Sequence, residues 1–319
     1  MSDTQRAQPW VDAETAAREM ERRLSLKVLR KEPLAEHTTM RVGGPADLLV
    51  TIRDRFALRG LVRLAASRGW PLLVLGRGSN VVVGDAGIRG IVALNRSAGY
   101  DVDQAAGTIS FDSGVPMAKA STIAAEAGLT GLEFALAIPG NIGGAIWANA
   151  GAHGGEMAAI TTSVTLLRAD GTEVDIPAAD AAFAYRESRF KRPEGSGEVI
   201  LGASVALQQG EPDLIKAHLE EIRRWRREHQ PLGIPSAGSV FRNPPGGQSA
   251  GALIEAAGMK GVRIGGAEVA EMHANWILNR GGATAADIRA LHDACRDAVQ
   301  AQHGITLATE IAFIGEFAA

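Results

Sequence analysis

Glycine is the residue that most constrains how this chain can fold. The sequence of 319 residues has 38 glycines, and many of them stand in pairs or short clusters. Because glycine has no Cβ, such clusters occur where a backbone turns tightly or approaches a ligand closely. Taken singly, each cluster is more often a turn than a ligand site. The clusters are Gly43–Gly44, Gly76–Gly78, Gly140–Gly144, Gly151–Gly155, Gly246–Gly247, Gly258–Gly261, Gly265–Gly266 and Gly281–Gly282.

The length and composition are typical of a globular protein of about two domains, or three small ones. Hydrophobic residues make up 46% and charged residues 22% of the chain. A net charge of -3 provides no general attraction to nucleic acid or to a membrane. The single cysteine, Cys295, excludes an internal disulfide and fits a reducing compartment. No obligate protein partner is evident, and we expect a cytoplasmic protein.

Two segments could be mistaken for targeting or membrane signals. Residues 1–25 mix acidic residues with arginines and lack the apolar region of a secretion signal. Leu136–Ala150 is the nearest candidate for a membrane span, but proline and glycines interrupt it. We therefore predict a glycine-rich loop or buried turn for Leu136–Ala150.

The first third of the chain predicts a small α/β unit after an N-terminal extension. Residues 1–30 are predicted to form a charged, amphipathic helix that is loosely attached to the rest of the protein. Ala46–Ile52 reads as a strand and Arg53–Gly69 as a helix, with Phe56 on its apolar face and Gly69 ending it. Two further strands are expected at Pro71–Leu75 and Ile91–Leu94.

The rest of the chain mixes helices and strands without a regular alternation, which predicts an α+β fold. Ala169-Asp170-Gly171 is a turn signal between two strand-like runs, so Thr162–Arg168 and Thr172–Ile176 should form a hairpin. Ser249 and Thr284 are expected to cap helices, Thr284 in a capping box with Asp287. Other expected helices are Pro116–Ala127, Asp213–His229, Ala250–Ala257 and the segment from Thr284 to about Gln302; other expected strands are Thr108–Asp112, Glu198–Leu207, Ile305–Leu307 and Glu310–Ile314.

Several common motifs are absent or incomplete. The segment from Gly76 to Val81 begins like a dinucleotide-binding fingerprint, but Val81 stands where the third glycine is needed. The sequence contains no phosphate loop of the GxxxxGK[ST] type, no HExxH pair and no GxSxG nucleophile motif. The seven histidines are scattered, so no metal site is predicted.

Leu75–Asn80 is the most informative of the glycine clusters. It follows an apolar strand, and its two glycines with Ser79 and Asn80 can form a concave nest of backbone N–H groups. Such a nest suits an anion, although an ordinary polar turn is an equal alternative at this point.

The segment also resembles the pyrophosphate-binding loop of the vanillyl-alcohol-oxidase-like FAD-binding family. Five further stretches, in the same order along the chain, resemble motifs of UDP-N-acetylenolpyruvoylglucosamine reductases of the compact type II form. The matches together cover roughly residues 35–315. The stretches are His37–Ala46, Ala137–Gly154, Tyr185–Phe190, Pro235–Pro244 and the substrate-domain group of Leu253–Gly261, Ile264–Ala267 and His273–Asn275.

This resemblance implies a two-lobed FAD-binding module and a C-terminal α+β substrate-binding domain. The implied division is an N-terminal helical extension at 1–30, FAD-binding subdomains at 31–96 and 97–209, and a substrate-binding domain at 210–319. The implied reaction is reduction of an enolpyruvyl UDP-sugar by NADPH through non-covalently bound FAD. The implied cofactor-binding residues are Arg41, Gly76, Arg77, Gly78, Ser79, Asn80, Gly114, Pro139, Gly140, Gly143 and Gly144.

Three residues match the catalytic set of this reductase family. Ser239 corresponds to the proton donor, Arg186 to the guanidinium that pairs with the substrate carboxylate, and Glu310 to a residue that polarises the carboxylate or relays a proton. Each residue also has a purely structural interpretation. Ser239 could be a turn residue, Arg186 could form a surface salt bridge, and Glu310 could lie at the solvent-exposed edge of a strand. The implied substrate contacts are Asn243, Lys260, His273 and Asn275.

Five positions depart from the family pattern beside the flavin, namely His37, Met40, Arg77, Ala137 and Asn141. Two other functions share part of the pattern. Another flavin oxidoreductase, such as an alcohol or lactone oxidase, would need the Gly76–Asn80 loop but not the catalytic set. A flavin- or UDP-sugar-binding sensor would hold ligand without turnover.

Overall fold

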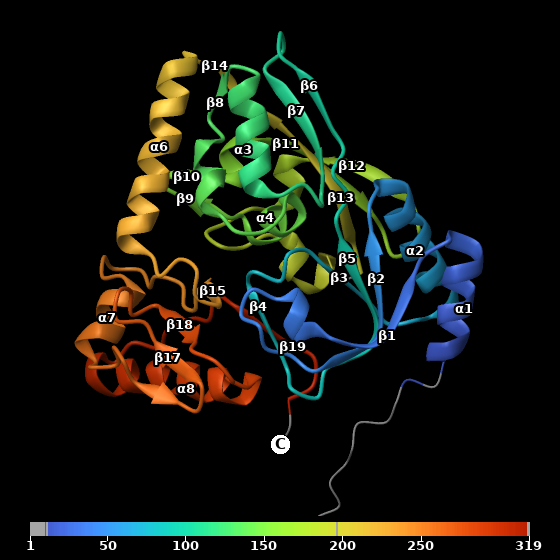
Figure 1. Cartoon of the computed structure of the whole chain (residues 1–319). Helices are drawn as coiled ribbons and strands as arrows, with labels where there is room; N and C mark the ends of the chain where they lie inside the picture. The colour runs from blue at the N-terminus through green and yellow to red at the C-terminus, as the bar shows by residue number, and fades with distance from the viewer. Residues whose placement is uncertain (1–9, 11, 196, 318–319) are drawn as a thin grey trace, which may run out of the picture.

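The computed structural model describes residues 10, 12–195 and 197–317. Its first region is a four-stranded sheet of order β1-β2-β5-β3, with two helices packed against it (Figure 1). β2 pairs in parallel with β5, and β5 with β3. The elements are α1 (Ala13–Leu24), β1 (Val28–Pro33), β2 (Pro45–Ile52), α2 (Arg55–Arg68), β3 (Leu72–Leu75), β4 (Val81–Val83) and β5 (Ile88–Asn95).

The N-terminal helix is shorter and better packed than expected. It ends at Leu24, because Ser25 adopts a left-handed conformation, and residues 28–30 belong to β1. Ala16, Ala17 and Met20 are fully buried in the core shared with α2. The predicted helix is therefore confirmed at 13–24 and wrong at 28–30, and the expectation of loose attachment is wrong. Residues 1–9 and 11 lie outside the described part of the chain.

Helix α2 ends at Gly69 as expected, and its expected apolar face is buried at Leu58, Leu61, Val62, Leu64 and Ala65. Asp54 accepts a hydrogen bond from the N–H of Ala57, and Gly69 ends the helix in the left-handed conformation. Phe56, however, is 71% exposed, and the Arg59 guanidinium lies 5.1 Å from the centre of its ring. The expectation for Phe56 fails because it lies on the solvent side of the first turn.

The second region is an antiparallel sheet of order β12-β11-β13-β7-β6. The predicted hairpin is confirmed, since β11 and β12 pair in antiparallel register. Helices α3 and α4 bury apolar side chains in one core with this sheet. The elements are β6 (Tyr100–Asp103), β7 (Thr108–Asp112), α3 (Met117–Glu126), β8 (Leu129–Thr130), a 3-10 helix at Glu133–Ala137, α4 (Ile142–Ala148), β9 (Gly151–Ala152), β10 (Gly155–Glu156), α5 (Met157–Ile160), β11 (Thr161–Leu167), β12 (Glu173–Pro177), β13 (Val199–Ala206) and β14 (Gln208–Gln209).

Residues 142–148 form helix α4, which corrects the prediction of a glycine-rich loop or buried turn for that part of Leu136–Ala150. Helix α4 begins after Asn141, and Ile142 and Ile146 are fully buried on its inner side. Gly143 is required by space rather than by a turn, because a Cβ there would lie 2.9 Å from the Cβ of Ser113. Gly143 is therefore explained by close approach in the first turn of α4.

The third region is a four-stranded sheet of order β15-β18-β17-β16, covered on one face by α7 and α8. Both predicted N-caps are confirmed, including the capping box of Thr284 and Asp287. Long α6 packs instead against α3 and the Glu133–Ala137 turn of the second region (Figure 1). The elements are α6 (Pro212–His229), β15 (Ser236–Ser239), α7 (Ala250–Ala256), β16 (Arg263–Ile264), β17 (Ala267–Val269), β18 (Trp276–Asn279), α8 (Ala285–His303) and β19 (Ala312–Ile314).

The C-terminal segment differs from the prediction of two strands. Residues 305–307 are irregular after the left-handed cap Gly304, and Glu310 precedes β19 rather than lying within it. β19 pairs in parallel with β4 of the first region. The end of the chain therefore returns to the Gly76–Asn80 loop.

Asp85 connects the first and third regions at the N-terminus of α8. Its two carboxylate oxygens accept hydrogen bonds from the N–H groups of Ala285 (2.8 Å) and Ala286 (3.0 Å). A carboxylate at this position satisfies helix donors and complements the helix dipole. We predict that Asp85→Ala lowers the free energy of unfolding by about 1–2 kcal/mol in urea denaturation. Asp101→Ala, in exposed strand β6, is the control, and an equal loss there would contradict the prediction.

Candidate active site

The Gly76–Asn80 loop lies between β3 and β4 and contacts two other predicted flavin segments. Gly78 has a φ of +62°, and a Cβ there would lie 2.6 Å from the carbonyl oxygen of His37. The Gly78 carbonyl accepts hydrogen bonds from the backbone N–H and hydroxyl of Thr39. Ser79 donates its hydroxyl to the Pro139 carbonyl at 2.8 Å. The structure thus brings together residues 37–39, 76–80 and 139–140.

Glycines shape the wall beside this loop. A Cβ on Gly76 would lie 3.0 Å from Oδ1 of Asn141, and one on Gly140 would lie 3.0 Å from the Ser79 hydroxyl. Gly114 is more tightly enclosed, since a Cβ there would lie 2.4 Å from the backbone nitrogen of Ser97. Gly114 is therefore needed for the fold itself. Gly76 and Gly140 allow close packing against Asn141 and Ser79 beside the predicted cofactor site.

Asn141 is a buried polar residue at the centre of this wall. Its amide nitrogen donates to the carbonyls of Gly114 (2.6 Å) and Asn95 (3.3 Å). Its Oδ1 is buried and has no hydrogen-bond partner in the described chain. An unpartnered buried acceptor facing a glycine fits a site that a polar ligand completes.

A cavity of about 240 Å³ lies next to the loop. Arg96 donates to the Gly76 carbonyl at 2.7 Å, and burial and then the nearby Arg77 lower the pKa of its guanidinium. Two neighbouring cations at a concave surface fit an anionic group. The cavity is lined by Glu36, His37, Thr38, Thr39, Arg77 and Arg96.

Arg41 has a different environment from Arg77. Its side chain is exposed and its backbone is left-handed, with a φ of +55°. The buried amide of Asn279 donates to the carbonyls of Met40 (3.1 Å) and Arg41 (3.4 Å), which ties this segment to β18. Sequence reasoning missed Asn279, because a single asparagine at the end of an apolar strand carries no distinctive signal.

The three predicted catalytic residues come together at Glu310. The Nε of Arg186 lies 3.3 Å from Oε1 of Glu310. The backbone N–H of Glu310 donates to the carbonyl of Val240, which places Ser239 next to the same segment. Asn80 of the predicted flavin loop donates its side-chain amide to the Glu310 carbonyl at 3.2 Å. The catalytic candidates and the loop therefore adjoin one another.

Arg186 is held in an uncommon conformation. Its φ is +53°, in the left-handed region that non-glycine residues rarely occupy. Its Nη2 donates to the Gly151 carbonyl at 2.7 Å, and its own carbonyl accepts from Nζ of Lys191 at 2.8 Å. Local backbone strain of this kind is found at functional sites. Arg186 is thus fixed from both its side chain and its backbone.

Glu310 is surrounded by cations but lies mostly out of solvent. Burial raises the pKa of its carboxyl group, and the positive charges of Arg186, Lys191 and Arg242 act in the opposite direction. Burial also lowers the pKa of the Lys191 ammonium, to which the charge of Arg242 adds. Lys191 and Arg242 were not predicted, because nothing in the sequence places either beside Glu310.

The predicted substrate residues are mostly engaged with their own neighbours. Oδ1 of Asn243 accepts from the N–H of Ala250, and Lys260 forms an ion pair of 2.7 Å with Glu255. Asn275 is buried and forms two hydrogen bonds with the backbone of Phe241, at 3.0 and 2.8 Å. These two bonds fix the strand segment that carries Ser239.

His273 and His292 each contact residues next to that segment. Nδ1 of His273 accepts from the N–H of Asn275 at 3.3 Å, and burial lowers the pKa of the His273 imidazole. His292 was not predicted. Its ring stacks on Phe241 and its Nε2 lies 3.0 Å from the Thr309 hydroxyl, directly before Glu310.

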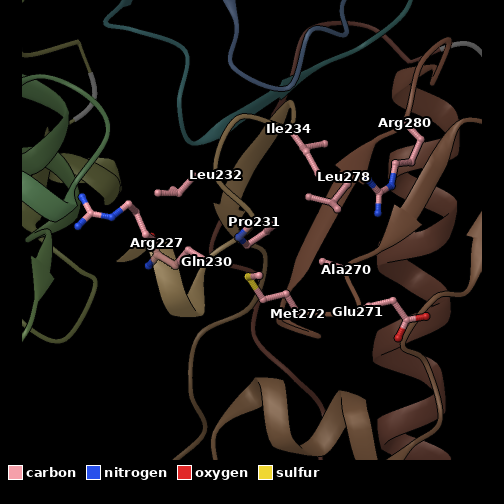
Figure 2. A pocket seen from close by; sticks show the side chains of 10 residues that line it. All are labelled: Arg227, Gln230, Pro231, Leu232, Ile234, Ala270, Glu271, Met272, Leu278 and Arg280. Atoms are coloured by element: carbon pink, nitrogen blue, oxygen red, sulfur yellow. The ribbon is translucent and has the colours of Figure 1, made fainter. Parts of the chain in front are cut away.

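A second cavity, of about 370 Å³, lies between the C-terminal end of α6 and β18. Figure 2 shows its apolar side chains, among them Leu232, Ile234 and Leu278, with Arg227 and Arg280 at its rim. None of the residues predicted for the site lines this cavity.

Comparison with known proteins decides the family. Residues 46–177 match the family described as FAD binding domain. Residues 230–314 match the C-terminal domain of UDP-N-acetylenolpyruvoylglucosamine reductase. A reductase of this name from Heliobacterium modesticaldum is 44% identical over 90% of this chain and 91% of its own. The chain belongs to the UDP-N-acetylenolpyruvoylglucosamine reductase family. Its relative from Moorella thermoacetica is 43% identical over 96% of this chain and 99% of its own.

A solved structure of this reductase family gives the same result. The crystal structure of UDP-N-acetylenolpyruvylglucosamine reductase from Thermus caldophilus has a TM-score of 0.75 to this chain and 33% identity, and covers 90% of this chain and 98% of that one. The predicted fold class, an FAD-binding module followed by a C-terminal α+β domain, is confirmed. Across the described residues, no cluster of three or more potential metal ligands occurs, and no helix is long and apolar enough to cross a membrane.

A substitution at Gly144 should affect cofactor binding and fold stability in opposite directions. It is exposed in the first turn of α4, and a Cβ there would meet no atom within 4 Å. Alanine is a better helix former than glycine, so Gly144→Ala should raise the free energy of unfolding of the apoprotein by up to about 1 kcal/mol. If the open space receives FAD, the same change should weaken FAD binding at least about tenfold, since 1.4 kcal/mol of steric cost suffices.

The control for Gly144 is Gly304→Ala, which alters a left-handed cap with no neighbour within 4 Å and lies at the far end of α8. That change should reduce stability without altering intrinsic FAD affinity. Flavin fluorescence titration and urea denaturation measure the two quantities. Unchanged FAD affinity in Gly144→Ala would remove Gly144 from the cofactor site.

Proposed function

We propose that this chain reduces UDP-N-acetylglucosamine enolpyruvate to UDP-N-acetylmuramate with NADPH and FAD, a step in peptidoglycan precursor synthesis. The main support is the convergence of Arg186 and the Ser239 segment on Glu310, next to a loop of the FAD-binding type. The residues beside this loop fit FAD, because Gly144 has open space next to it, Oδ1 of Asn141 is unpartnered among the described residues, and Arg77 and Arg96 supply positive charge.

When bound, FAD would accept hydride from NADPH and supply it to the terminal carbon of the enolpyruvyl group. Ser239 would donate the proton to the adjacent carbon, where negative charge accumulates. A serine hydroxyl is a weak acid, so it serves this purpose only against a strongly basic, enolate-like centre. Arg186 would pair with the substrate carboxylate through its planar fork of donors.

Glu310 would carry a proton at the carboxylate end of the site. Its raised pKa, caused by burial, keeps the acid form present at higher pH than in an exposed glutamate. A protonated Glu310 can donate a hydrogen bond to the substrate carboxylate or return the proton that Ser239 loses. Lys191 supports this arrangement by holding the carbonyl of Arg186.

The remaining substrate assignments follow from the family. We propose that Asn243, Lys260, His273 and Asn275 line the UDP-sugar side, with Asn275 acting mainly by fixing Phe241. The division into an extension at 1–30, FAD-binding subdomains at 31–96 and 97–209 and a substrate domain at 210–319 is proposed likewise. A cytoplasmic location is proposed, because NADPH and UDP-sugars are cytoplasmic metabolites.

An anaerobic absorbance experiment tests the function. The FAD-loaded protein should lose its flavin absorbance with NADPH and regain it with the enolpyruvyl UDP-sugar. UDP-N-acetylglucosamine, which lacks the enolpyruvyl group, is the control and should not restore the absorbance. Loss without recovery would favour another flavin oxidoreductase. Binding of flavin without reduction by NADPH would favour a sensor.

A further inference from the structure

The cluster around Glu310 holds more basic groups than acidic groups, whether or not Glu310 is protonated. Arg186, Lys191 and Arg242 supply three basic groups, and Glu187 and Glu310 supply two acidic groups. All five groups are at least partly out of solvent, so the excess charge is less screened than it would be on an open surface. A site with this excess of positive charge favours an anionic ligand group.

The two arginines bracket one carboxylate. Nε of Arg186 lies 3.3 Å from Oε1 of Glu310, and Nε of Arg242 lies 3.7 Å from Oε2. The second distance is too long for a hydrogen bond. Both of its atoms, Arg242 Nε and Glu310 Oε2, are buried without a hydrogen-bond partner among the described residues. Buried polar atoms of this kind are costly unless a ligand or water completes them.

Arg242 is held in place but keeps free donors. Its Nη1 donates to Oε2 of Glu187 at 3.2 Å, which fixes the plane of the guanidinium. Its backbone N–H donates to the carbonyl of Ala308, so the residue is anchored to the segment that leads to Glu310. The side chains of Arg186 and Arg242 are each 27% exposed, and in the described chain no bond is made by Nη1 of Arg186 or Nη2 of Arg242.

We propose that Arg242 is a second substrate-binding arginine, which holds the enolpyruvyl carboxylate together with Arg186. This proposal rests on the proposed function and adds a residue to it. A carboxylate has two oxygens, and one N–H donor from each guanidinium satisfies both. The negative charge of the carboxylate offsets positive charge of the cluster. Glu187 acts as the residue that orients Arg242.

The test compares two ligands on the oxidised, FAD-loaded protein. The enolpyruvyl UDP-sugar has the carboxylate, and UDP-N-acetylglucosamine lacks it. In Arg242→Gln, affinity for the enolpyruvyl ligand should fall about tenfold to a hundredfold, the range expected for a lost hydrogen bond to a charged group. Affinity for UDP-N-acetylglucosamine should change less than about twofold, as expected when no contact is removed. Titration of the flavin absorbance measures both.

Two further variants keep the test decisive. Arg242→Lys retains the charge without the planar fork, so it should lose part of the affinity for the enolpyruvyl ligand alone; it replaces Arg242→Gln if that variant does not fold. Arg263→Gln, at a 65% exposed arginine of the third region, should change neither affinity. Equal losses for both ligands, or no loss for either, would overturn the role of Arg242. Failure of the wild type to distinguish the two ligands would instead count against the proposed function.

Discussion

Ser239→Ala should retain FAD and be reduced by NADPH at the normal rate, yet return electrons to the enolpyruvyl substrate about 10²–10⁴ times more slowly, the range for loss of a general acid. Ser239 ends β15 opposite Trp276, and no hydrogen bond uses its hydroxyl within the described residues. The hydroxyl is therefore free to meet a substrate. Removing it leaves the backbone bonds of the segment intact, so the loss should be confined to proton transfer.

Anaerobic stopped-flow absorbance separates the two half-reactions of this variant. Ser236→Ala, in the same strand, is the matched control. The Thr39 hydroxyl donates its hydrogen bond to the backbone carbonyl of Ser236, so the substitution leaves that bond in place. It should keep both half-reactions close to the wild-type rates. Ordinary reoxidation of Ser239→Ala by the substrate would show that another group supplies the proton.

The catalytic candidates were predictable from the sequence only through the family resemblance. Arg186, Ser239 and Glu310 stand far apart along the chain, and no periodicity connects them. Arg186 and Glu310 form an ion pair although 124 positions separate them in the sequence, and local sequence patterns do not indicate such a pairing. Arg242 and Lys191 escaped notice for the same reason, since a basic residue becomes informative only when its carboxylate neighbours are known.

Local sequence patterns predicted the ends of several helices correctly. They failed where contacts between distant parts of the chain determine the structure. The caps at Ser249, Thr284 and Gly69 depend on hydrogen bonds within a few residues, so the sequence contains them. The helix at Ile142–Ala148 was missed because Gly143 suggested a loop, whereas the contact with Ser113 explains that glycine. Glu310 lies outside a strand, and its backbone N–H donates to the carbonyl of Val240, a contact that its apolar neighbours in the sequence do not indicate.

Glu310→Gln should slow reoxidation by the substrate about 10²–10⁴-fold if Glu310 relays the proton, because an amide keeps the shape of the acid but cannot release a proton. It should also remove a pH dependence. Burial raises the pKa of Glu310, so the acid form persists above the usual range and is lost as pH rises through the raised value. The wild-type rate should therefore fall over that interval, and the variant should lack this fall.

The pH dependence of the free energy of unfolding provides an independent check on the direction of the Glu310 pKa shift. A carboxyl group with a raised pKa binds more protons in the folded than in the unfolded state, so it reduces stability as pH rises from the unfolded to the folded pKa. Glu310→Gln should flatten that slope in urea denaturation. Lys191 is the other candidate for a fall in rate, since burial lowers the pKa of its ammonium. A pH dependence that survives Glu310→Gln but disappears in Lys191→Met would assign it to the lysine, and Glu310 would then act by orienting Arg186 alone.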